Sequence, residues 1–437
     1  MPNPVDDAPQ QTGPISLPVE GGSRRSLRGF HRGVASLSLI ALVAVSLVLW
    51  QHPPRLQRGT DELSVPSRSY DPRLERYQTP ESAAFCADWR EDGSNEASAE
   101  FALAVDNASL TFLLSRGPLH GDVHIVEAES SSGPFKVAVS ARFDTKDRLE
   151  ATKACLMSLE QEQGVLFWAE PRHPHGDPRQ DVRLNITLSV PRSSGTGKPG
   201  HNDLSTDLPL FSHHVGEFFH FFSGTDFERI RLRSSNAPVD FGSLIGRSAF
   251  IETSNAEMRG FFAGLELDAR TSNGELKATA FMFGDADGAK APVNLWTSNG
   301  EVNAALSLAS DYKDNSIHAT IRTSNAKMLV QTRLLGDNTT IVLNASTSNG
   351  PADLYLDSTF EGEYDIQTSL GTAKIDRNPN TRDPSGGTRE HVITRTRTGK
   401  RASGLVYWGK DGEGPAEDAR LGEVTLKTSN APVVLHL

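Results

Sequence analysis

A four-residue motif that returns along the second half of the chain constrains the fold more than any other feature. Ser-Ser-Asn-Ala or Thr-Ser-Asn-Gly/Ala occurs seven times after Ile230, and most successive copies lie 18 to 26 residues apart. That spacing is typical of one coil of a solenoid, in which each repeat packs only against its neighbours. The motif asparagines are Asn236, Asn255, Asn273, Asn299, Asn325, Asn349 and Asn430.

Residues on both sides of each motif alternate between apolar and polar, as in β-strands. Apolar residues stand four positions before each asparagine and three after it. Inward positions on one straight strand differ by an even number, so this odd separation of seven requires a corner at each Ser-Asn step. Asparagine and glycine suit a corner because they tolerate left-handed backbone. We therefore expect stacked β-arcs whose asparagines form a hydrogen-bonded column.

An eighth copy is predicted at Thr368–Gly371, where Leu370 replaces the asparagine and the flanking apolar residues keep their phase. An insertion near residues 376–414 separates this copy from the motif of Asn430. Its segment HVITRTRTGKRASGLVYW predicts a hairpin that turns near Lys400.

One segment near the N-terminus is apolar enough to cross a membrane. Residues 34–50 carry no charge and would span about 25 Å as a helix, close to the thickness of a thin bilayer. Arg24, Arg25, Arg28 and Arg32 precede them, so the positive-inside rule places the N-terminus in the cytoplasm. The alternative, a cleaved signal peptide, needs small residues after the apolar run, where bulky ones stand. We expect an uncleaved type II anchor, with the bulk of the chain lumenal or extracellular.

The sequence divides into six parts by composition and pattern. They are a disordered cytoplasmic tail (1–33), a transmembrane helix (34–50), a Pro-rich stalk (51–81), an antiparallel β-rich segment (82–194), a linker with a first strand (195–228) and the solenoid repeats (229–437). The predicted fold class is thus all-β, a β-solenoid preceded by antiparallel strands.

Two further features fit a secreted environment. Cys86 and Cys155 are the only cysteines and predict a disulfide, with two buried free thiols as the alternative. N-glycosylation sequons occur only after the apolar segment, at Asn107, Asn185, Asn338 and Asn344.

The Thr-Ser-Asn-Gly pattern with in-phase apolar flanks is similar to the bacterial putative-adhesin repeat domain of unknown function. The whole layout resembles uncharacterised fungal single-pass membrane proteins that carry a related domain. The resemblance covers roughly residues 82–437 and implies a β-solenoid. It brings no catalytic residues with it.

The negative net charge of the chain makes some classes of binding partner less favourable than others. The net charge is -11, and residues 1–50 contribute +1, so the remainder carries -12 and disfavours nucleic acid. The expected partners are the lipid bilayer, through residues 34–50, and either glycans or proteins of a cell wall or cell surface. No cofactor is expected.

Several polar clusters invite a chemical interpretation. Asp285 and Asp287 in FMFGDADG could hold a metal in a glycosyltransferase of this topology, but an ordinary turn between two coils explains them better. His213, His214, Glu217 and His220 fit the polar positions of a half-buried strand, and His173 and His175 fit a solvated loop. Asp240, Glu257, Glu275 and Glu301 fit the solvated side of strands. We therefore predict no catalytic or metal-binding residue and a non-enzymatic binding or scaffolding protein. A carbohydrate-active enzyme of the secretory pathway or cell surface is the alternative.

Overall fold

The computed structural model describes part of the chain that follows Tyr70. The described residues are 71–437 except 92, 105–109, 129–132, 171–181, 192–200, 217–226, 285–290, 311–315, 337–338, 396–398, 411 and 417–418. The predicted tail, the membrane segment 34–50 and most of the stalk lie outside them. Within the described residues, no helix has the length and apolar character needed to cross a bilayer.

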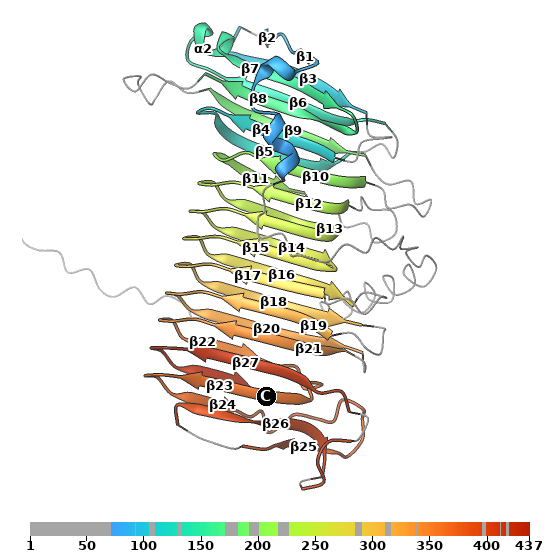
Figure 1. The fold of residues 1–437 in the computed structure, drawn as a ribbon, viewed down its shortest axis with the longest axis vertical. Helices are drawn as coiled ribbons and strands as arrows, with labels where there is room; N and C mark the ends of the chain where they lie inside the picture. The colour runs from blue at the N-terminus through green and yellow to red at the C-terminus, as the bar shows by residue number, and fades with distance from the viewer. Residues whose placement is uncertain are drawn as a thin grey trace, which may run out of the picture. The chain divides into compact units, whose positions relative to one another are not determined.

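Two β-sheets, here sheet A and sheet B, face each other and share strand β13 (Val239–Glu252) (Figure 1). In order of pairing, sheet A contains β1 (Phe85–Cys86), β7 (Thr152–Leu159), β8 (Glu162–Ala169), β4 (Leu110–Arg116), β10 (His201–Asp207), β12 (Phe227–Arg233), β13, β15 (Glu266–Arg270), β17 (Ala291–Trp296), β19 (Ser316–Arg322), β21 (Thr340–Ser346), β27 (Gly422–Thr428), β23 (Gly362–Thr368), β26 (Arg401–Gly409) and β25 (Glu390–Ile393). Sheet B contains β2 (Arg90–Glu91), β3 (Glu96–Leu103), β6 (Phe135–Arg142), β9 (Arg183–Val190), β5 (His120–Glu127), β11 (Phe211–Val215), β13, β14 (Met258–Gly264), β16 (Leu276–Phe283), β18 (Val302–Ala309), β20 (Met328–Leu335), β22 (Ala352–Tyr355), β28 (Val433–His436) and β24 (Ala373–Asp376).

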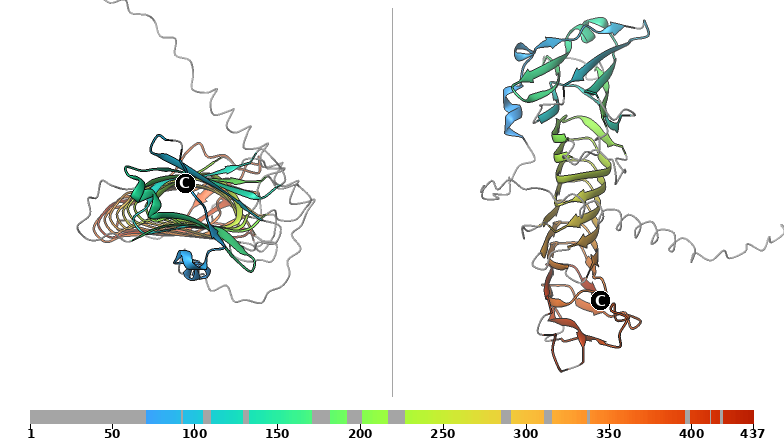
Figure 2. Two further views of the ribbon diagram at one scale, coloured as in Figure 1. Left: turned by 90° about the horizontal axis from the view of Figure 1, so that it is seen from above. Right: turned by 90° about the vertical axis from the view of Figure 1, so that its right-hand side faces the viewer.

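Each coil of the solenoid follows one path. A strand of sheet A leads into the Thr-Ser-Asn arc, a strand of sheet B follows, and the chain returns to sheet A one step further along. Strands of successive coils pair in parallel, for example β17 with β19 and β16 with β18. Viewed from above, the two sheets enclose a flat interior (Figure 2). The prediction of an all-β fold with the parallel strands of a solenoid is confirmed.

The core lies between the sheets and follows the predicted parity. Strand β18 alternates between buried and more exposed positions, and Leu295 before the arc and Val302 after it are both buried. Each such aliphatic side chain contributes about 1.5–3 kcal/mol by leaving water. Because every coil repeats these positions, the core is continuous along the stack.

The backbone conformation of the Ser-Asn corner differs from the prediction, which was a left-handed backbone. None of the motif asparagines or glycines has a positive φ. Glycine is needed at Gly300 for another reason: a Cβ there would lie 1.7 Å from the carbonyl oxygen of Gly274 in the preceding coil. Close stacking of the arcs, rather than backbone handedness, selects the small residue.

The segment before the repeats also differs from the prediction. Strands β4 and β5 pair in parallel with β8 and β9, and antiparallel pairs such as β3–β6 and β7–β8 occur beside them. Residues 195–228, expected as a linker with a first strand, contain β10 and β11, which form a complete coil joined in parallel to β12 and β13. The pattern around this coil lacks the motif asparagine, so its arc escaped notice in the sequence.

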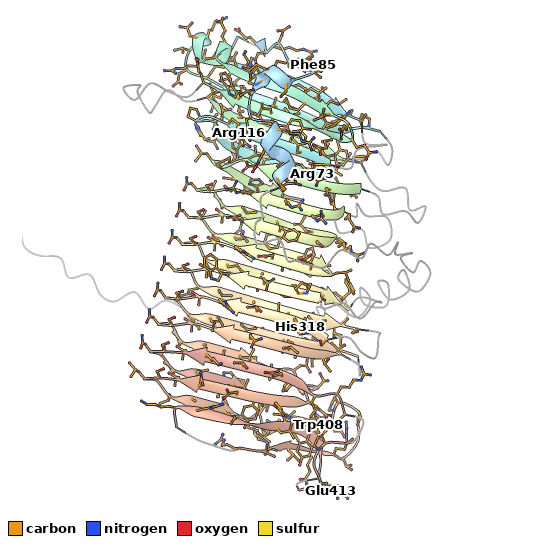
Figure 3. All side chains as sticks on the ribbon, viewed as in Figure 1. Arg73, Phe85, Arg116, His318, Trp408 and Glu413 are labelled. Carbon is orange, nitrogen blue, oxygen red and sulfur yellow. A yellow bond between two sulfur atoms is a disulfide. The ribbon has the colours of Figure 1, made fainter. Side chains whose placement is uncertain are left out.

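The last ten or so residues assigned to the stalk pack against sheet A. Helix η1 (Pro72–Arg76) carries Leu74, which is buried with Tyr77, and the Tyr77 hydroxyl donates to Glu162 at 2.8 Å. Arg73, labelled in Figure 3, donates to Asp203 at 2.6 Å. The folded unit therefore includes this segment, which lies before residue 82.

A buried ion pair fixes the same segment. The Arg231 guanidinium donates to Asp71 at 2.8 Å, and Arg73 donates to it at 2.7 Å. Burial raises the pKa of Asp71, but the hydrogen bonds and charges of Arg73 and Arg231 outweigh it, so the pKa lies below its ordinary value. The chain thus enters the folded unit through a charged, ordered contact.

Candidate binding surface

The arcs form one edge of the stack, and their asparagines form a continuous column. Each Asn Nδ2 donates to the Asn Oδ1 of the coil before it in the stack, over 2.5–2.6 Å, from Asn430 up to Asn236. All seven amides therefore point the same way. Since hydrogen bonds in a chain polarise one another, the Asn236 end is the donor end and the Asn430 end the acceptor end.

The threonines of the motif form a second, buried row beneath the asparagines. The Thr297 hydroxyl donates to the carbonyl oxygen of Gly274 at 3.2 Å and accepts from the Gly300 N–H at 3.1 Å. The same pattern recurs at Thr271, Thr347 and other arcs. The hydroxyl thus satisfies backbone groups that the corner takes out of the strand ladder.

Leucine occupies the asparagine position in the arcs that adjoin the two ends of the column. In the other arcs, the N–H of each motif asparagine donates to the carbonyl of the motif serine in the adjoining arc. The Asn236 N–H donates instead to the Pro209 carbonyl, so Pro209 takes the place of the serine and Leu210 that of the asparagine. Below Asn430 stands Leu370, the predicted eighth copy, which is 71% exposed. The column ends where leucine replaces the amide.

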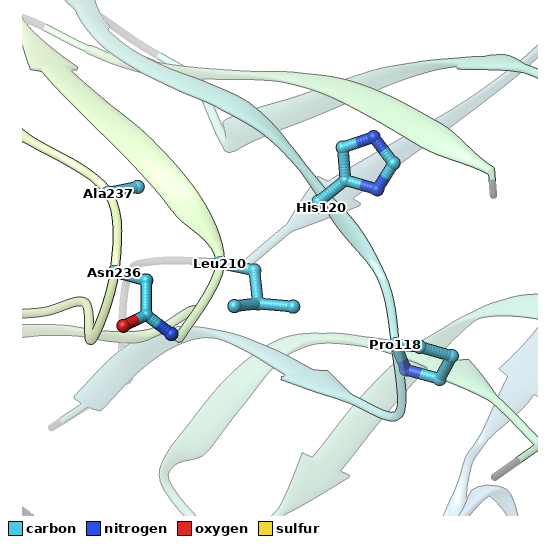
Figure 4. Close-up of a pocket in the computed structure, with 5 residues that line it drawn as sticks. All are labelled: Pro118, His120, Leu210, Asn236 and Ala237. Atoms are coloured by element: carbon cyan, nitrogen blue, oxygen red, sulfur yellow. The ribbon is translucent and has the colours of Figure 1, made fainter. Parts of the chain in front are cut away.

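A shallow hollow of about 330 Å³ lies at the donor end of the column (Figure 4). It is lined by Pro118, His120, Leu210, Asn236 and Ala237. Its walls come from three successive arcs, and it is open to solvent. The hollow is too shallow to enclose a small molecule, which favours an extended ligand over a buried one.

The outer face of sheet A carries an exposed tryptophan among its parallel strands. Trp296 is 40% exposed and lies between Arg270 and Arg322 on the neighbouring strands. Arg270 is held by a bidentate pair with Asp268, with distances of 2.6 and 2.5 Å. Arg322 is exposed and has no carboxylate partner among the residues that the structure describes.

Polar side chains line the same face beside the tryptophan. Asn294 and Thr320 are neighbours on β17 and β19, and Asn344 follows on β21. His318, labelled in Figure 3, also points outward from β19. An exposed indole bordered by an exposed guanidinium and by amide and hydroxyl groups can stack on a ring and hydrogen-bond to its substituents.

The outer face of sheet B carries several ion pairs near the arcs. Asp240 pairs with Arg259 at 2.8 Å, and Lys277 pairs with Glu275 at 2.8 Å and with Glu257 at 3.6 Å. Asp240 is an outward residue of β13, as the sequence indicated, whereas Glu257, Glu275 and Glu301 lie at the ends of the arcs, immediately before β14, β16 and β18. Ion pairs of this exposed kind contribute little to stability, because water screens them.

A second exposed aromatic residue lies on sheet B. Tyr355 stacks on His436 with ring centroids 3.9 Å apart, and His436 Nδ1 lies 3.3 Å from Asp376. The Tyr355 side chain is 40% exposed, like Trp296, but one of its faces is covered by the imidazole. Lys374 and then His436 hold the pKa of Asp376 below its ordinary value.

The histidine cluster of the sequence separates in the structure. His213 is fully buried, where Nδ1 faces the Phe211 carbonyl at 3.1 Å and Nε2 faces the Thr206 hydroxyl at 2.8 Å. Burial lowers the pKa of His213 to about 4, so it is neutral at pH 7. His214 points outward and stacks on His124. Glu217 and His220, like His173, His175, Asp285 and Asp287, lie outside the described residues.

The remaining predicted residues fall as follows. Cys86 and Cys155 form a disulfide between β1 and β7. Asn185 on β9 and Asn344 on β21 are exposed on the outer faces of sheets B and A. The other two sequons, at Asn107 and Asn338, lie outside the described residues, and glycosylation of all four stays a prediction.

No protein-family model and no curated protein matches the sequence. Solved structures that resemble it include a putative cell adhesion protein from Clostridium sporogenes, with 10% identity, a TM-score of 0.18, and coverage of 78% of this chain and 99% of that one. A putative adhesin from Parabacteroides merdae has 8% identity, a TM-score of 0.27, and coverage of 61% and 92%. A putative lipid binding protein from Parabacteroides distasonis has 10% identity, a TM-score of 0.27, and coverage of 61% and 91%. This is a remote structural similarity to bacterial putative adhesins, and no argument about a ligand follows from it.

Sequence reasoning did not single out Trp296. Leu295 must point into the core, so the next residue, Trp296, points outward. The position of each residue relative to the motif asparagine would have predicted this. Counting outward positions from each motif asparagine would have found the tryptophan, since no other coil has an aromatic residue at this position among the described strands.

Proposed function

We propose that the protein is a type II membrane-anchored, non-enzymatic binding protein of the fungal secretory pathway or cell surface, and that sheet A binds a glycan chain. The observation that carries this proposal is Trp296, which lies exposed on a flat parallel sheet between two arginines. An indole stacks on the apolar face of a sugar ring, and a flat face without a deep cavity suits a chain ligand.

Charge suggests which sugars bind best. Arg270 is neutralised by Asp268, whereas Arg322 has no carboxylate partner among the described residues, so its guanidinium is available for a bidentate bond to a carboxylate or sulfate. We therefore expect acidic glycans to bind more tightly than neutral ones of the same length. Their affinity should fall as salt is added.

Binding is tested with the full chain in detergent micelles on an array of neutral and acidic glycans. W296A should lower the affinity at least tenfold, because a central tryptophan typically contributes about 2 kcal/mol or more at an interface. Y355A is the matched control, since Tyr355 is equally exposed on the opposite sheet. Equal effects of W296A and Y355A would remove the proposed site.

The chain's own glycosylation is part of the same test. Asn344 lies two strands from Trp296 on the same face, so an N-glycan there could cover the site. The array is therefore probed before and after enzymatic removal of N-glycans.

Released sugar is measured in parallel with binding. If sugar is released and D285N/D287N abolishes this release, the alternative function, a carbohydrate-active enzyme, is correct. Binding without product supports the proposal.

A further inference from the structure

The last coil of the chain does not occupy the last place in the stack. Strand β27 pairs in parallel with β21 on one side and β23 on the other, and β28 pairs in the same way with β22 and β24. Figure 1 shows β27 between β21 and β23. Residues 422–437 therefore fill a slot one coil wide, between the arcs of Asn349 and Leu370.

The contacts that fill the slot are the same as those between any two coils. Asn430 donates to Asn349 at 2.5 Å, and Thr428 donates to the Gly350 carbonyl at 3.2 Å. Val433 and Leu435 are fully buried in the common core. The slot thus recognises an arc-forming peptide by its Thr-Ser-Asn-Ala corner and its inward apolar residues.

Non-covalent contacts hold the last residues of this segment, and they include the stacking of His436 on Tyr355 and several backbone hydrogen bonds. The Leu437 N–H donates to the Asp376 carbonyl at 2.9 Å, and the Asn378 N–H donates to the Leu437 carbonyl at 2.7 Å. The segment follows every other strand in the sequence, so it can leave or enter the slot while the other coils stay paired. Strands β25 and β26 stay paired with β23, and the twelve residues 410–421 that join β26 to β27 span about 40 Å when extended at roughly 3.3 Å per residue, far enough to reach an adjoining molecule.

We propose that this slot is a peptide-binding site and that its occupant in trans is the C-terminal coil of a second copy of the chain. A second copy carries the same segment, so it reproduces every contact of the intramolecular coil. Reciprocal exchange gives a closed dimer, and one-way exchange would link molecules in series. This inference is independent of the proposed glycan site.

The exchange can be trapped with cysteines in the full chain. Asp353 and Val434 are register partners on β22 and β28, and both point outward. Neighbouring strands lie about 4.8 Å apart, within the range for a disulfide. The protein's two natural cysteines are already bridged. Chains with D353C alone and with V434C alone are mixed, warmed until the terminal coil exchanges, cooled and oxidised.

A disulfide-linked dimer from the mixture, absent from either variant alone, is the expected result. The double variant D353C/V434C should close the bridge within one chain and serves as the geometric control. Adding V433D to the V434C chain should abolish the dimer, because Val433 points into the core. Monomer alone from the mixture, with a closed bridge in the double variant, would overturn the proposal.

A second measurement covers the case in which the cysteine pair fails to bridge. The full chain with V433D and L435D cannot seat its own coil, and it is titrated with a fluorescent peptide of residues 422–437. Binding of this peptide supports the proposal. The V434D peptide, altered at the adjacent outward position, should bind within about threefold of the natural one, and the V433D peptide at least tenfold more weakly. No binding, or equal binding of all three peptides, would refute the proposal that the slot recognises the core-facing side chains of the peptide.

Discussion

The buried threonine row gives the sharpest test of how the arcs are stabilised. At the arc of Asn299, the Thr297 hydroxyl bonds to two buried backbone groups, the Gly274 carbonyl and the Gly300 N–H. T297V keeps the shape of the side chain and removes the hydroxyl. Both backbone groups then lose this partner in a place that water does not reach.

The loss of stability expected for T297V can be compared with the loss expected when one asparagine is removed from the column. Leaving a buried polar group unsatisfied costs about 1–3 kcal/mol, so two such groups make T297V destabilising by about 2–6 kcal/mol. N299A also removes two hydrogen bonds, those to Asn273 and from Asn325, but these are exposed and water replaces them. We expect N299A to cost only about 1 kcal/mol.

Urea denaturation followed by circular dichroism measures both changes. T297S retains the hydroxyl and is the matched control, with an expected cost below about 1 kcal/mol from the lost methyl group. The midpoints are compared only among variants with the same denaturant slope, because repeat proteins can unfold in parts. A larger loss for N299A than for T297V, or equal losses for T297V and T297S, would refute the reasoning.

Three further changes have expected outcomes. L370N adds an amide next to Asn430 and should raise the free energy of unfolding by about 0.5–1 kcal/mol, which the same urea titration measures; destabilisation would mean that the column cannot be extended. The pKa of His213 is about 4 in the folded chain and about 6.5 when unfolded, so its contribution to stability is present above pH 6.5 and is lost as the pH falls towards 4, by about 3 kcal/mol; H213N should flatten this part of the pH profile. Replacing Cys86 and Cys155 with serine opens a loop with a sequence separation of 69 and should cost about 4 kcal/mol, seen as a lower melting temperature; an unchanged melting temperature would contradict the chain-entropy account.

Parity and periodicity were enough to predict the coil path and the side of each strand that faces the core. The positions of Leu295 and Val302, seven residues apart and both inward, required a corner between them, and the structure has one. What the pattern could not show was how the corner is made. Asn and Gly are typical of left-handed turns, yet here the small residue is selected by the carbonyl oxygen of the preceding arc, a contact between residues far apart in sequence.

The order of the coils could not be predicted for a related reason. Most coils present the same motif and the same inward positions, so local sequence does not specify which coil lies next to a given coil. The coil of Leu370 precedes that of Asn430 in the chain but lies beyond it in the stack. The coil of β10 and β11 was missed because Leu210 stands where the motif has asparagine.

A stack of identical parallel coils has no inherent end, and this chain stops it by departing from its own repeat. An exposed edge of parallel strands would pair with further chains. In sheet A, antiparallel pairs close the series at both ends, β1–β7–β8 at one and β23–β26–β25 at the other. In sheet B the last strand, β24, is short and presents Lys374 and Asp376. The amide column stops at Leu370 beside one of these ends, and at Leu210 before the antiparallel pairs of the other end are reached. The interior slot filled by residues 422–437 lacks such protection, because an identical coil fits it from either the same chain or another one.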